Sequence, residues 1–231
     1  MKNISFIIAI LSAGLAYAQS TIGGSGAQQN YSSNYGNLQS FGYSVKLGNR
    51  LSQTDGSFYL FDNWNNIGAV YTEDKQKISI LNINLNIERH TFESKINGDS
   101  IFTFNFNNIN KFVINNKEYK NFYWDGDNKV YQVLYDNGSI QILKGFRVLF
   151  VSGTVNSMIN RPRDKYIRKE LLYLRKDNKI SDFKLKKSHI LKLAREKGVK
   201  AIDVELYAKT NNLSFKKEKN LKRILDYIEN N

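Results

Sequence analysis

The sequence predicts an α+β fold: a mainly antiparallel β-sheet comes first, and two or three short helices come last. Short runs that alternate apolar and polar residues recur between positions 57 and 184, and Asn-Gly or Asp-Gly pairs separate several of them. The apolar spacing then changes to a helical period over the last forty-odd residues. The 231 residues include no cysteine, so core packing must hold the fold without disulfides. These patterns fit a meander, a sandwich or a barrel-like sheet equally well.

Residues 1–18 have the order of a secretory signal peptide. Lys2 precedes an apolar run over residues 4–11, and Ala16-Tyr17-Ala18 places small residues where signal peptidase binds. A membrane anchor is the alternative, but the run is shorter than the about 20 apolar residues that span a bilayer. We therefore expect an exported protein that is periplasmic, associated with the outer membrane or secreted. Residues 19–45 are rich in Gly, Ser, Asn and Gln, which predicts a flexible leader.

Residues 46–187 are predicted to form the antiparallel β domain. The clearest strand covers residues 77–87, where Ile and Leu at odd positions alternate with Asn from position 82 onward. Asn97-Gly98 and Asp136-Asn137-Gly138 predict hairpin turns, because Asn and Gly tolerate the positive φ that tight hairpins require. A surface loop is expected over residues 152–165, which contain the only proline. Further strands are predicted at residues 57–61, 67–71, 91–96, 100–106, 118–123, 130–135, 139–144, 146–151, 171–175 and 179–184.

Residues 188–231 are predicted to form a basic helical tail, packed on the β domain or appended to it. Ser188 is expected to cap the first helix and Gly198 to end it. A second helix is expected over residues 202–210, before Asn211-Asn212, and Ser214 is expected to cap a third. The third helix carries one apolar stripe, formed by Leu221, Ile224, Leu225 and Ile228. We expect the stripe to pack on the sheet; the alternative is that it lies on a membrane with its lysines in water.

The net charge of +13 is concentrated in the last third of the chain. Residues 1–160 hold 13 Lys and Arg against 11 Asp and Glu, whereas residues 161–231 hold 21 against 10. Such a surface attracts anions, although it can also serve only as a solvated face that keeps the protein soluble. The predicted contact residues are Lys184, Lys186, Lys187, Lys192, Lys216, Lys217, Lys222 and Arg223.

An anionic envelope component is the partner that best matches export: an acidic glycan, lipopolysaccharide or phospholipid head groups. Another envelope protein is a further candidate. Nucleic acid is not expected, because no known reader motif occurs and an exported protein rarely meets DNA. No further apolar stretch of spanning length follows the signal peptide, so no transmembrane segment is expected after cleavage.

The residues that carry catalysis or bind metals are sparse in this sequence. The two histidines, His90 and His189, lack ligand-spaced partners, and without cysteine no thiolate chemistry exists. Asp125 and Asp127 are weak metal candidates, because their oxygens lie close in sequence but lack the later Glu of a calcium loop. Turn formation fully explains this Asp-Gly-Asp run. No cofactor and no catalytic residue is assigned.

Aromatic residues make up 13% of the chain. Several of them, including Trp64, Tyr123 and Trp124, lie near predicted turns, where exposed rings bind sugars and peptides. Filling a β core that has no disulfides is the simpler explanation.

Two segments resemble a family of uncharacterised exported β-rich proteins of Bacteroidetes. Gly56-Ser57-Phe58-Tyr59-Leu60-Phe61-Asp62-Asn63-Trp64, followed by Gly68-Ala69-Val70-Tyr71, is similar to the family's opening "G-S-x-Y-L-F-x-x-W" motif. Residues 207–214 and 224–230 resemble its Lys-rich helical tail. The likeness covers most of residues 56–231. It implies a Gram-negative envelope or secreted setting, and it implies no reaction.

The sequence thus favours a non-enzymatic cell-envelope binding or interaction module with a basic C-terminal face. A glycan or cell-wall hydrolase and a lipid-binding β-barrel are the alternatives. Converging carboxylates in a deep pocket would favour the hydrolase, and an apolar cavity open to solvent would favour the lipid-binding barrel.

Overall fold

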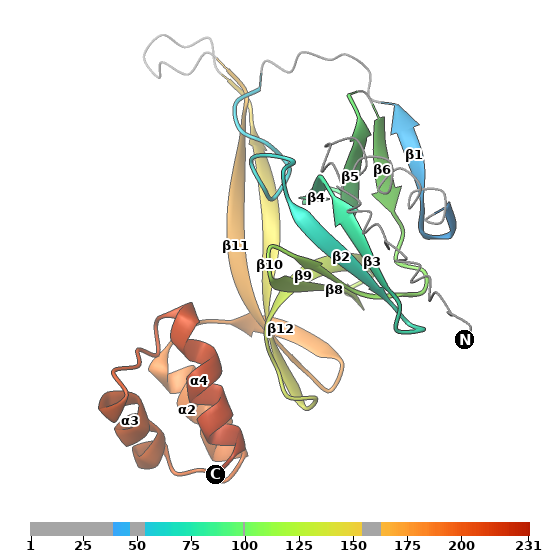
Figure 1. The fold of residues 1–231 in the computed structure, drawn as a ribbon. Helices are drawn as coiled ribbons and strands as arrows, with labels where there is room; N and C mark the ends of the chain where they lie inside the picture. The colour runs from blue at the N-terminus through green and yellow to red at the C-terminus, as the bar shows by residue number, and fades with distance from the viewer. Residues whose placement is uncertain (1–38, 47–53, 99, 154–162) are drawn as a thin grey trace, which may run out of the picture.

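The computed structural model describes residues 39–46, 54–98, 100–153 and 163–231. The predicted signal peptide and residues 19–38 of the predicted leader lie outside these ranges. The α+β prediction is confirmed: two antiparallel sheets are followed by three short C-terminal helices (Figure 1). None of the helices in the described ranges is long and apolar enough to cross a membrane.

The smaller sheet has four strands in the order β1-β6-β5-β4. Its strands are β1 (Gly42–Lys46), β4 (Ile83–Asn86), β5 (Thr91–Asn97) and β6 (Ser100–Phe104). A 3₁₀ turn, η1 (Gln39–Phe41), precedes β1, and Phe41 packs against the main core. Residues 39–45 of the predicted leader therefore belong to the folded body, because β1 forms an antiparallel ladder with β6.

The larger sheet has eight strands in the order β12-β11-β10-β9-β8-β7-β2-β3, and the two end strands leave it open. Its strands are β2 (Ile67–Thr72), β3 (Lys77–Leu81), β7 (Ile109–Ile114), β8 (Lys117–Trp124), β9 (Asp127–Asp136), β10 (Ile140–Val151), β11 (Lys165–Lys176) and β12 (Lys179–Phe183). Strands β7 to β12 form a meander, in which each strand pairs with the next along the chain. The two predicted strands at 139–144 and 146–151 are one strand, β10. Strand β7 was not predicted.

The chain passes from one sheet to the other at Asn82. The strand predicted over residues 77–87 is therefore wrong as a single element: β3 ends at Leu81 and β4 begins at Ile83. Asn82 has φ +53°, a left-handed conformation that breaks the extended backbone and that Asn adopts more readily than most residues. Its carbonyl accepts a hydrogen bond from the Lys95 N–H at 3.0 Å, which fixes the corner against β5.

Residues 57–61 form no regular strand, contrary to prediction, but they cover the edge of β4. The Leu60 N–H donates to the Leu85 carbonyl at 2.9 Å, and the Ile87 N–H donates to the Phe58 carbonyl at 2.9 Å. On the other side, the Arg168 guanidinium of β11 donates to the Leu60 carbonyl at 2.6 Å. Asp55 adds a backbone bridge to Lys165 at the start of β11. The segment thus links the small sheet to the large one.

The main core lies between the two sheets. Phe92 stacks on Phe112 with 4.0 Å between ring centroids, and Phe104 meets Phe112 edge-on at 5.4 Å. The buried apolar residues of this core are Val70, Ile80, Ile83, Leu85, Ile87, Phe92, Phe102, Phe104, Ile109, Phe112, Ile114, Tyr119, Val130 and Phe146. Aromatic and aliphatic burial therefore holds the two sheets together.

The three helices are α2 (Lys187–Glu196), α3 (Ala201–Thr210) and α4 (Glu218–Glu229). Together they form the helical unit, which packs on one end of the large sheet (Figure 1). The stripe of Leu221, Ile224, Leu225 and Ile228 is buried in a second core, against Tyr135, Ile142 and Phe183 of the sheet. The stripe therefore packs inside the protein, as expected, and is not free to lie on a membrane.

The predicted ends of the first two helices are right, and the predicted caps of the first and third helices are wrong. Gly198, at φ +84°, follows the last turn of α2, and Asn212, at φ +54°, follows α3. The N-caps, however, are Lys186 and Lys217 instead of Ser188 and Ser214. A left-handed residue stops a helix by its own backbone, whereas a cap position also depends on how the chain enters the helix.

Strands β9 and β10 separate partway along the large sheet. Their ladder ends at the pair Gly145 and Tyr131. Beyond it, β10 continues to Val151 paired with β11 alone, while the start of β9 pairs with β8 as far as Asp127. We call this divergence the fork. The turn at residues 87–90, between β4 and β5, contributes His90 to a cavity there.

Candidate functional site

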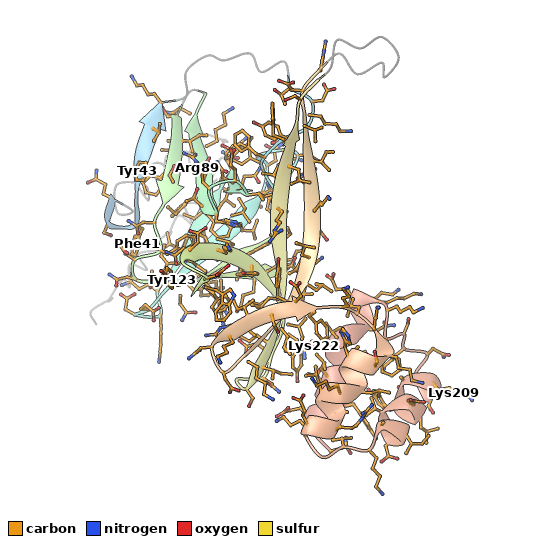
Figure 2. The ribbon with its side chains drawn as sticks, turned by 180° about the vertical axis from the view of Figure 1, so that it is seen from behind. Phe41, Tyr43, Arg89, Tyr123, Lys209 and Lys222 are labelled. Atoms are coloured by element: carbon orange, nitrogen blue, oxygen red, sulfur yellow. The ribbon has the colours of Figure 1, made fainter. Side chains whose placement is uncertain are left out.

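All eight predicted basic contact residues are exposed, and all belong to the helical unit or to its junction with β12. Figure 2 shows Lys209 and Lys222 on this unit, far from Tyr43 on the small sheet. Helices α2 and α4 run in the same direction along the sheet. Their C-terminal ends meet where Lys197 pairs with Glu229 at 2.9 Å.

The N-terminal ends of these two helices also lie at one level of the sheet. At the start of α2, the His189 ring lies 6.0 Å from the Phe183 ring of β12. At the start of α4, Glu218 pairs with Lys144 of β10 at 2.8 Å. The parallel arrangement therefore brings five of the predicted residues to the same end of the helical unit. They are Lys184, Lys186 and Lys187 beside α2, and Lys216 and Lys217 beside α4.

Two of the eight side chains form ion pairs with carboxylates of the same chain. Lys187 pairs with Glu205 at 2.8 Å, and Lys222 pairs with Asp226 at 2.7 Å. Arg223 donates a hydrogen bond to the Asn211 side-chain oxygen at 3.3 Å, a neutral acceptor. Within the described ranges, six of the eight form no ion pair: Lys184, Lys186, Lys192, Lys216, Lys217 and Arg223. We call these six residues the basic face.

The helix N-caps add positive potential at the same place. The N-caps of α2 and α4 are Lys186 and Lys217, and neither makes a side-chain capping hydrogen bond. The N-terminus of a helix carries a partial positive charge that Asp or Ser normally offsets at the N-cap. Two lysines at these positions increase the local positive potential. Without a bound anion this destabilises the first turns of α2 and α4, and it favours binding of an anion from outside the protein.

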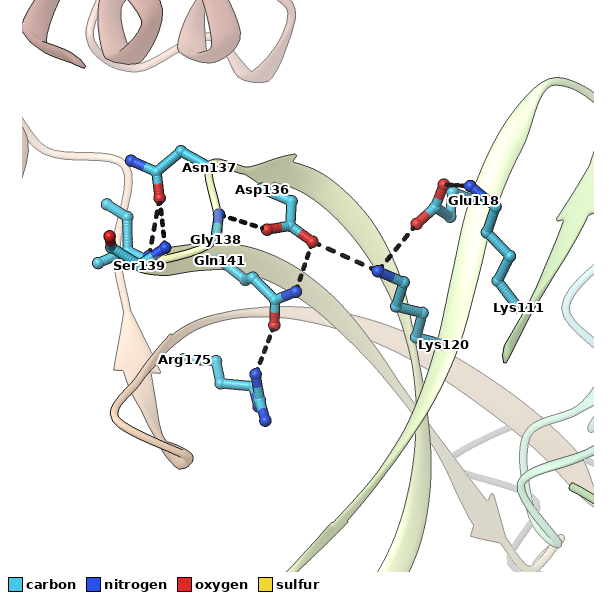
Figure 3. Close-up of polar contacts among 10 residues, drawn as sticks. Lys111, Glu118, Lys120, Asp136, Asn137, Gly138, Ser139, Gln141 and Arg175 are labelled. Atoms are coloured by element: carbon cyan, nitrogen blue, oxygen red, sulfur yellow. Dashed lines mark hydrogen bonds and ion pairs between the residues drawn. The ribbon is translucent and has the colours of Figure 1, made fainter. Parts of the chain in front are cut away.

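A network of polar side chains crosses the large sheet beside the helical unit (Figure 3). Lys120 lies between Glu118 and Asp136, at 3.3 Å from each carboxylate. Asp136 also accepts hydrogen bonds from the Gly138 N–H at 2.9 Å and the Gln141 amide at 2.6 Å. Burial alone would raise the pKa of Asp136, but these bonds together lower it below its ordinary value. The Asp136 carboxylate is therefore charged, and its oxygens are already bonded to Lys120, Gly138 and Gln141, which suits a structural role.

Asp125 and Asp127, the weak metal candidates, lie in the β8–β9 hairpin. Asp125 (φ +55°) and Gly126 (φ +77°) are the two turn residues, and the pair on either side is Trp124 with Asp127. Positive φ at both positions is the geometry of a tight hairpin turn that Asp-Gly favours. The Asp127 carboxylate accepts a hydrogen bond from the Asn128 N–H at 2.8 Å. Over the described ranges, no three His, Asp or Glu side chains gather as a metal site.

A cavity of about 220 Å³ lies at the fork. It is lined by His90, Trp124, Asp125, Lys129, Val130, Tyr131, Gly145, Phe146, Arg147, Tyr173, Ile180, Ser181 and Asp182. Gly145 forms part of its wall. A larger residue would crowd the cavity here, because a Cβ would lie 2.7 Å from the Tyr173 ring and 3.1 Å from the Tyr131 ring. Burial raises the pKa of Tyr131 to about 12, so its hydroxyl remains a hydrogen-bond donor at neutral pH.

His90 is the residue of this cavity that sequence reasoning missed. Burial lowers the pKa of its imidazole, so the ring is neutral at pH 7. Its Nδ1 atom is buried and has no hydrogen-bond partner among the residues that the structure describes. The residues of this cavity that the sequence did single out are Trp124, as an aromatic ring near a predicted turn, and Asp125, as a weak metal candidate.

Comparison with protein-family models, with curated proteins and with solved structures finds no match.

Proposed function

We propose that the protein is a non-enzymatic binding module of the cell envelope, which contacts an anionic component through the basic face. The observation that carries the proposal is the six exposed cations of the helical unit that have no carboxylate partner in the described ranges. The anionic component is an acidic glycan, lipopolysaccharide or phospholipid head groups. Their common chemistry is a dense array of phosphate or carboxylate groups on a surface or polymer.

The charge distribution supports a contact more than a passive solvated face. A surface that serves only solubility mixes both signs of charge, and exposed ion pairs of that kind contribute little. Here four of the six uncompensated cations, Lys184, Lys186, Lys216 and Lys217, lie where the N-terminal ends of α2 and α4 add their partial charges. Each Lys or Arg close to an anionic membrane contributes about 1 kcal/mol of attraction, so several acting together give measurable binding.

The state of three carboxylates argues against hydrolysis at their positions. Glycoside hydrolysis needs a pair of carboxyl groups that face a bond of the substrate. Glu93 is instead buried against Arg89, and Glu118 is held by Lys111 at 2.6 Å. Asp136 is held by Lys120 and Gln141, so these three groups hold strands together. Asp125 and Asp182, which line the cavity at the fork, are the carboxylates that a hydrolase would have to use.

The predicted signal peptide and the resemblance to an exported family support the envelope location. The proposal therefore has two parts that are tested separately: where the protein goes and what it binds. N-terminal sequencing of protein purified from its native cells tests the first part. A product that begins near Gln19 supports export, whereas a cytosolic product that retains Met1 contradicts it.

The binding part is tested by co-sedimentation of the chain with three probes: lipopolysaccharide micelles, phosphatidylglycerol vesicles and pectate, a polyuronate. The test variant changes Lys184, Lys186, Lys192, Lys216, Lys217 and Arg223 to Gln. The control variant removes the same number of charges elsewhere, by changing the exposed Lys46, Lys75, Lys77, Lys117, Lys165 and Lys169 to Gln. Because both lose six positive charges, a nonspecific effect of net charge cancels.

We expect wild type to bind at least one probe at about 0.05 M salt and to lose that binding at about 0.5 M salt, where screening is strong. The test variant should bind at least about tenfold more weakly, because it loses several contacts of about 1 kcal/mol each, while the control variant stays close to wild type. The probe that binds identifies the class of partner. Binding that is independent of salt, or equal weakening in both variants, contradicts the proposal.

A further inference from the structure

The cavity at the fork is built from parts of the chain that are far apart in sequence. The β8–β9 hairpin contributes Trp124 and Asp125, and β10 contributes Gly145 and Arg147. Strands β11 and β12 contribute the opposite side, and the β4–β5 turn contributes His90. The cavity exists because β9 and β10 stop pairing at Tyr131 and Gly145.

The lining of this cavity combines aromatic rings with both signs of charge. Trp124, Tyr131, Phe146 and Tyr173 supply the rings. The polar lining residues are His90, Asp125, Lys129, Arg147, Ser181 and Asp182. In the described part of the chain, Asp125, Lys129, Arg147 and Asp182 form no ion pair, so their hydrogen-bonding groups remain available to a ligand.

This combination selects one class of ligand. A hydrocarbon chain does not suit a wall that carries four charged groups, because burying them against it would leave them unpaired. A simple inorganic anion does not suit two aspartates. A sugar ring has hydroxyls that both donate to carboxylates and accept from Arg or Lys, and its C–H face packs on aromatic rings.

The size of the cavity indicates a single ring. Pockets for drug-sized ligands measure about 300–1,000 Å³, and this cavity is smaller. A second cavity, of about 330 Å³, shares His90, Phe146 and Arg147 with the first. It continues along β10 and β11 to Phe150 and Tyr166, whose rings lie 5.3 Å apart. Two adjoining cavities with aromatic walls suit consecutive units of a polymer.

We propose that the cavity at the fork binds one pyranose unit of a glycan, with the neighbouring unit in the adjoining cavity along β10 and β11. His90 lines both cavities, so its imidazole lies beside both proposed sugar subsites. The proposal goes beyond the charge-driven contact of the basic face and uses none of its residues.

Saturation-transfer NMR tests the proposal with a panel of methyl glycosides and their β-linked disaccharides. The panel contains glucose, galactose, mannose, N-acetylglucosamine and glucuronic acid. We expect transfer to at least one sugar, with the disaccharide bound more tightly than the monosaccharide. The glucuronide separates recognition of an acidic ring from recognition of a neutral one.

The site variant changes Asp182→Asn and Arg147→Gln, two exposed residues of the cavity. Its matched control changes Asp177→Asn, in the β11–β12 turn, and Arg195→Gln, at the end of α2, with the same change of charge. Circular dichroism confirms that both variants fold. The site variant should bind the selected sugar at least about tenfold more weakly, because each change removes a hydrogen bond to a charged group. The control should bind like wild type.

The sixfold variant of the basic face separates this proposal from the previous one. It should bind the sugar normally, because its substitutions lie outside the cavity. If none of the sugars receives saturation, or if the site variant and its control bind equally well, the assignment of this cavity to a glycan is wrong.

Discussion

Glu93 is a charged residue that the sequence suggests is exposed, because it alternates with apolar residues in the predicted strand 91–96. The structure buries it instead. Its side chain is 0% exposed, and it accepts hydrogen bonds from Tyr59 Oη at 2.5 Å and Asn86 Nδ2 at 3.1 Å. Thr91 and the Arg89 guanidinium complete the set of donors. Local sequence could not predict this site, because Tyr59 lies 34 positions away and approaches only after residues 57–61 cover β4. The exposure of the eight basic residues was predictable, because charged side chains of Lys and Arg are almost never fully buried without a partner.

The two partners of this ion pair should differ in their effect on stability. We predict that Arg89→Gln lowers the free energy of unfolding by about 3 kcal/mol, because it leaves a buried carboxylate without a counter-charge. Glu93→Gln should cost about 1–2 kcal/mol, because the Arg89 side chain is 54% exposed and water can solvate it. Urea unfolding at pH 7 measures both values. A larger loss for Glu93→Gln would show that the neutral donors, not Arg89, stabilise the carboxylate.

At the scale of elements, the turns and helix ends were predictable and the sheet corner was not. Asp125-Gly126 and Gly198 have positive φ values that their residue types favour locally. Asn82 also has positive φ, and the apolar period changes phase beside it: Ile78 and Ile80 of β3 face the core from even positions, whereas Ile83 and Leu85 of β4 face it from odd positions. A change of phase fits a bulge within one strand as well as a corner between two sheets, so the sequence alone does not identify the change of sheet.

Substitutions at Asn82 test the corner. We predict that Asn82→Gly retains near wild-type stability, because Gly adopts φ +53° without strain. Asn82→Val should lower the free energy of unfolding by about 1–2 kcal/mol, since a β-branched side chain is strained in the left-handed region. Thermal and urea unfolding compare the two variants. Equal stability of the Val and Gly variants would mean that the corner relaxes to an extended backbone.

At the scale of the whole molecule, the large sheet contributes to both the main core and the second core. Ile142 and Phe146, four positions apart on β10, belong to the second core and the main core respectively. The order of strands before helices predicted a helical unit beside a sheet, but it did not predict that the strands divide into two sheets. That division depends on which strands pair, and β2 pairs with β7 across the 36 intervening residues, 73–108, that sequence patterns do not connect.

Lys144 joins the helical unit to the sheet, and its removal should loosen that contact. It pairs with Glu218 of α4 at 2.8 Å and with Glu170 of β11 at 3.1 Å. We predict that Lys144→Gln lowers the free energy of unfolding by about 1 kcal/mol, discounted because both carboxylates are partly exposed. Hydrogen exchange should show faster opening of α4. Lys176→Gln, which breaks an exposed pair with Glu196, is the control and should change little. Equal exchange rates in α4 for both variants would contradict the role of Lys144.

The pH dependence of this contact follows from the same ammonium. Burial alone would lower the pKa of Lys144, but its hydrogen bonds to Glu218 and Glu170 outweigh burial and raise it above 10.5. Because the folded-state pKa is higher than the unfolded one, the stabilisation is complete below about pH 10.5. It is lost as the pH rises through the folded-state pKa. The difference in the free energy of unfolding between wild type and Lys144→Gln should therefore be constant near neutral pH and should narrow only under strongly alkaline conditions.

The bridge from residues 55–62 to β11 also has a consequence in time. Leu60 and Arg168, which it joins, are 108 positions apart, so nearly the whole remaining β region must emerge before the bridge closes. Contacts between such distant positions form late during folding. Until then this segment is held on β4 without the support of β11, by contacts such as the backbone hydrogen bonds of Leu60 and Ile87, so a nascent chain could expose that edge to a chaperone or to a neighbouring molecule.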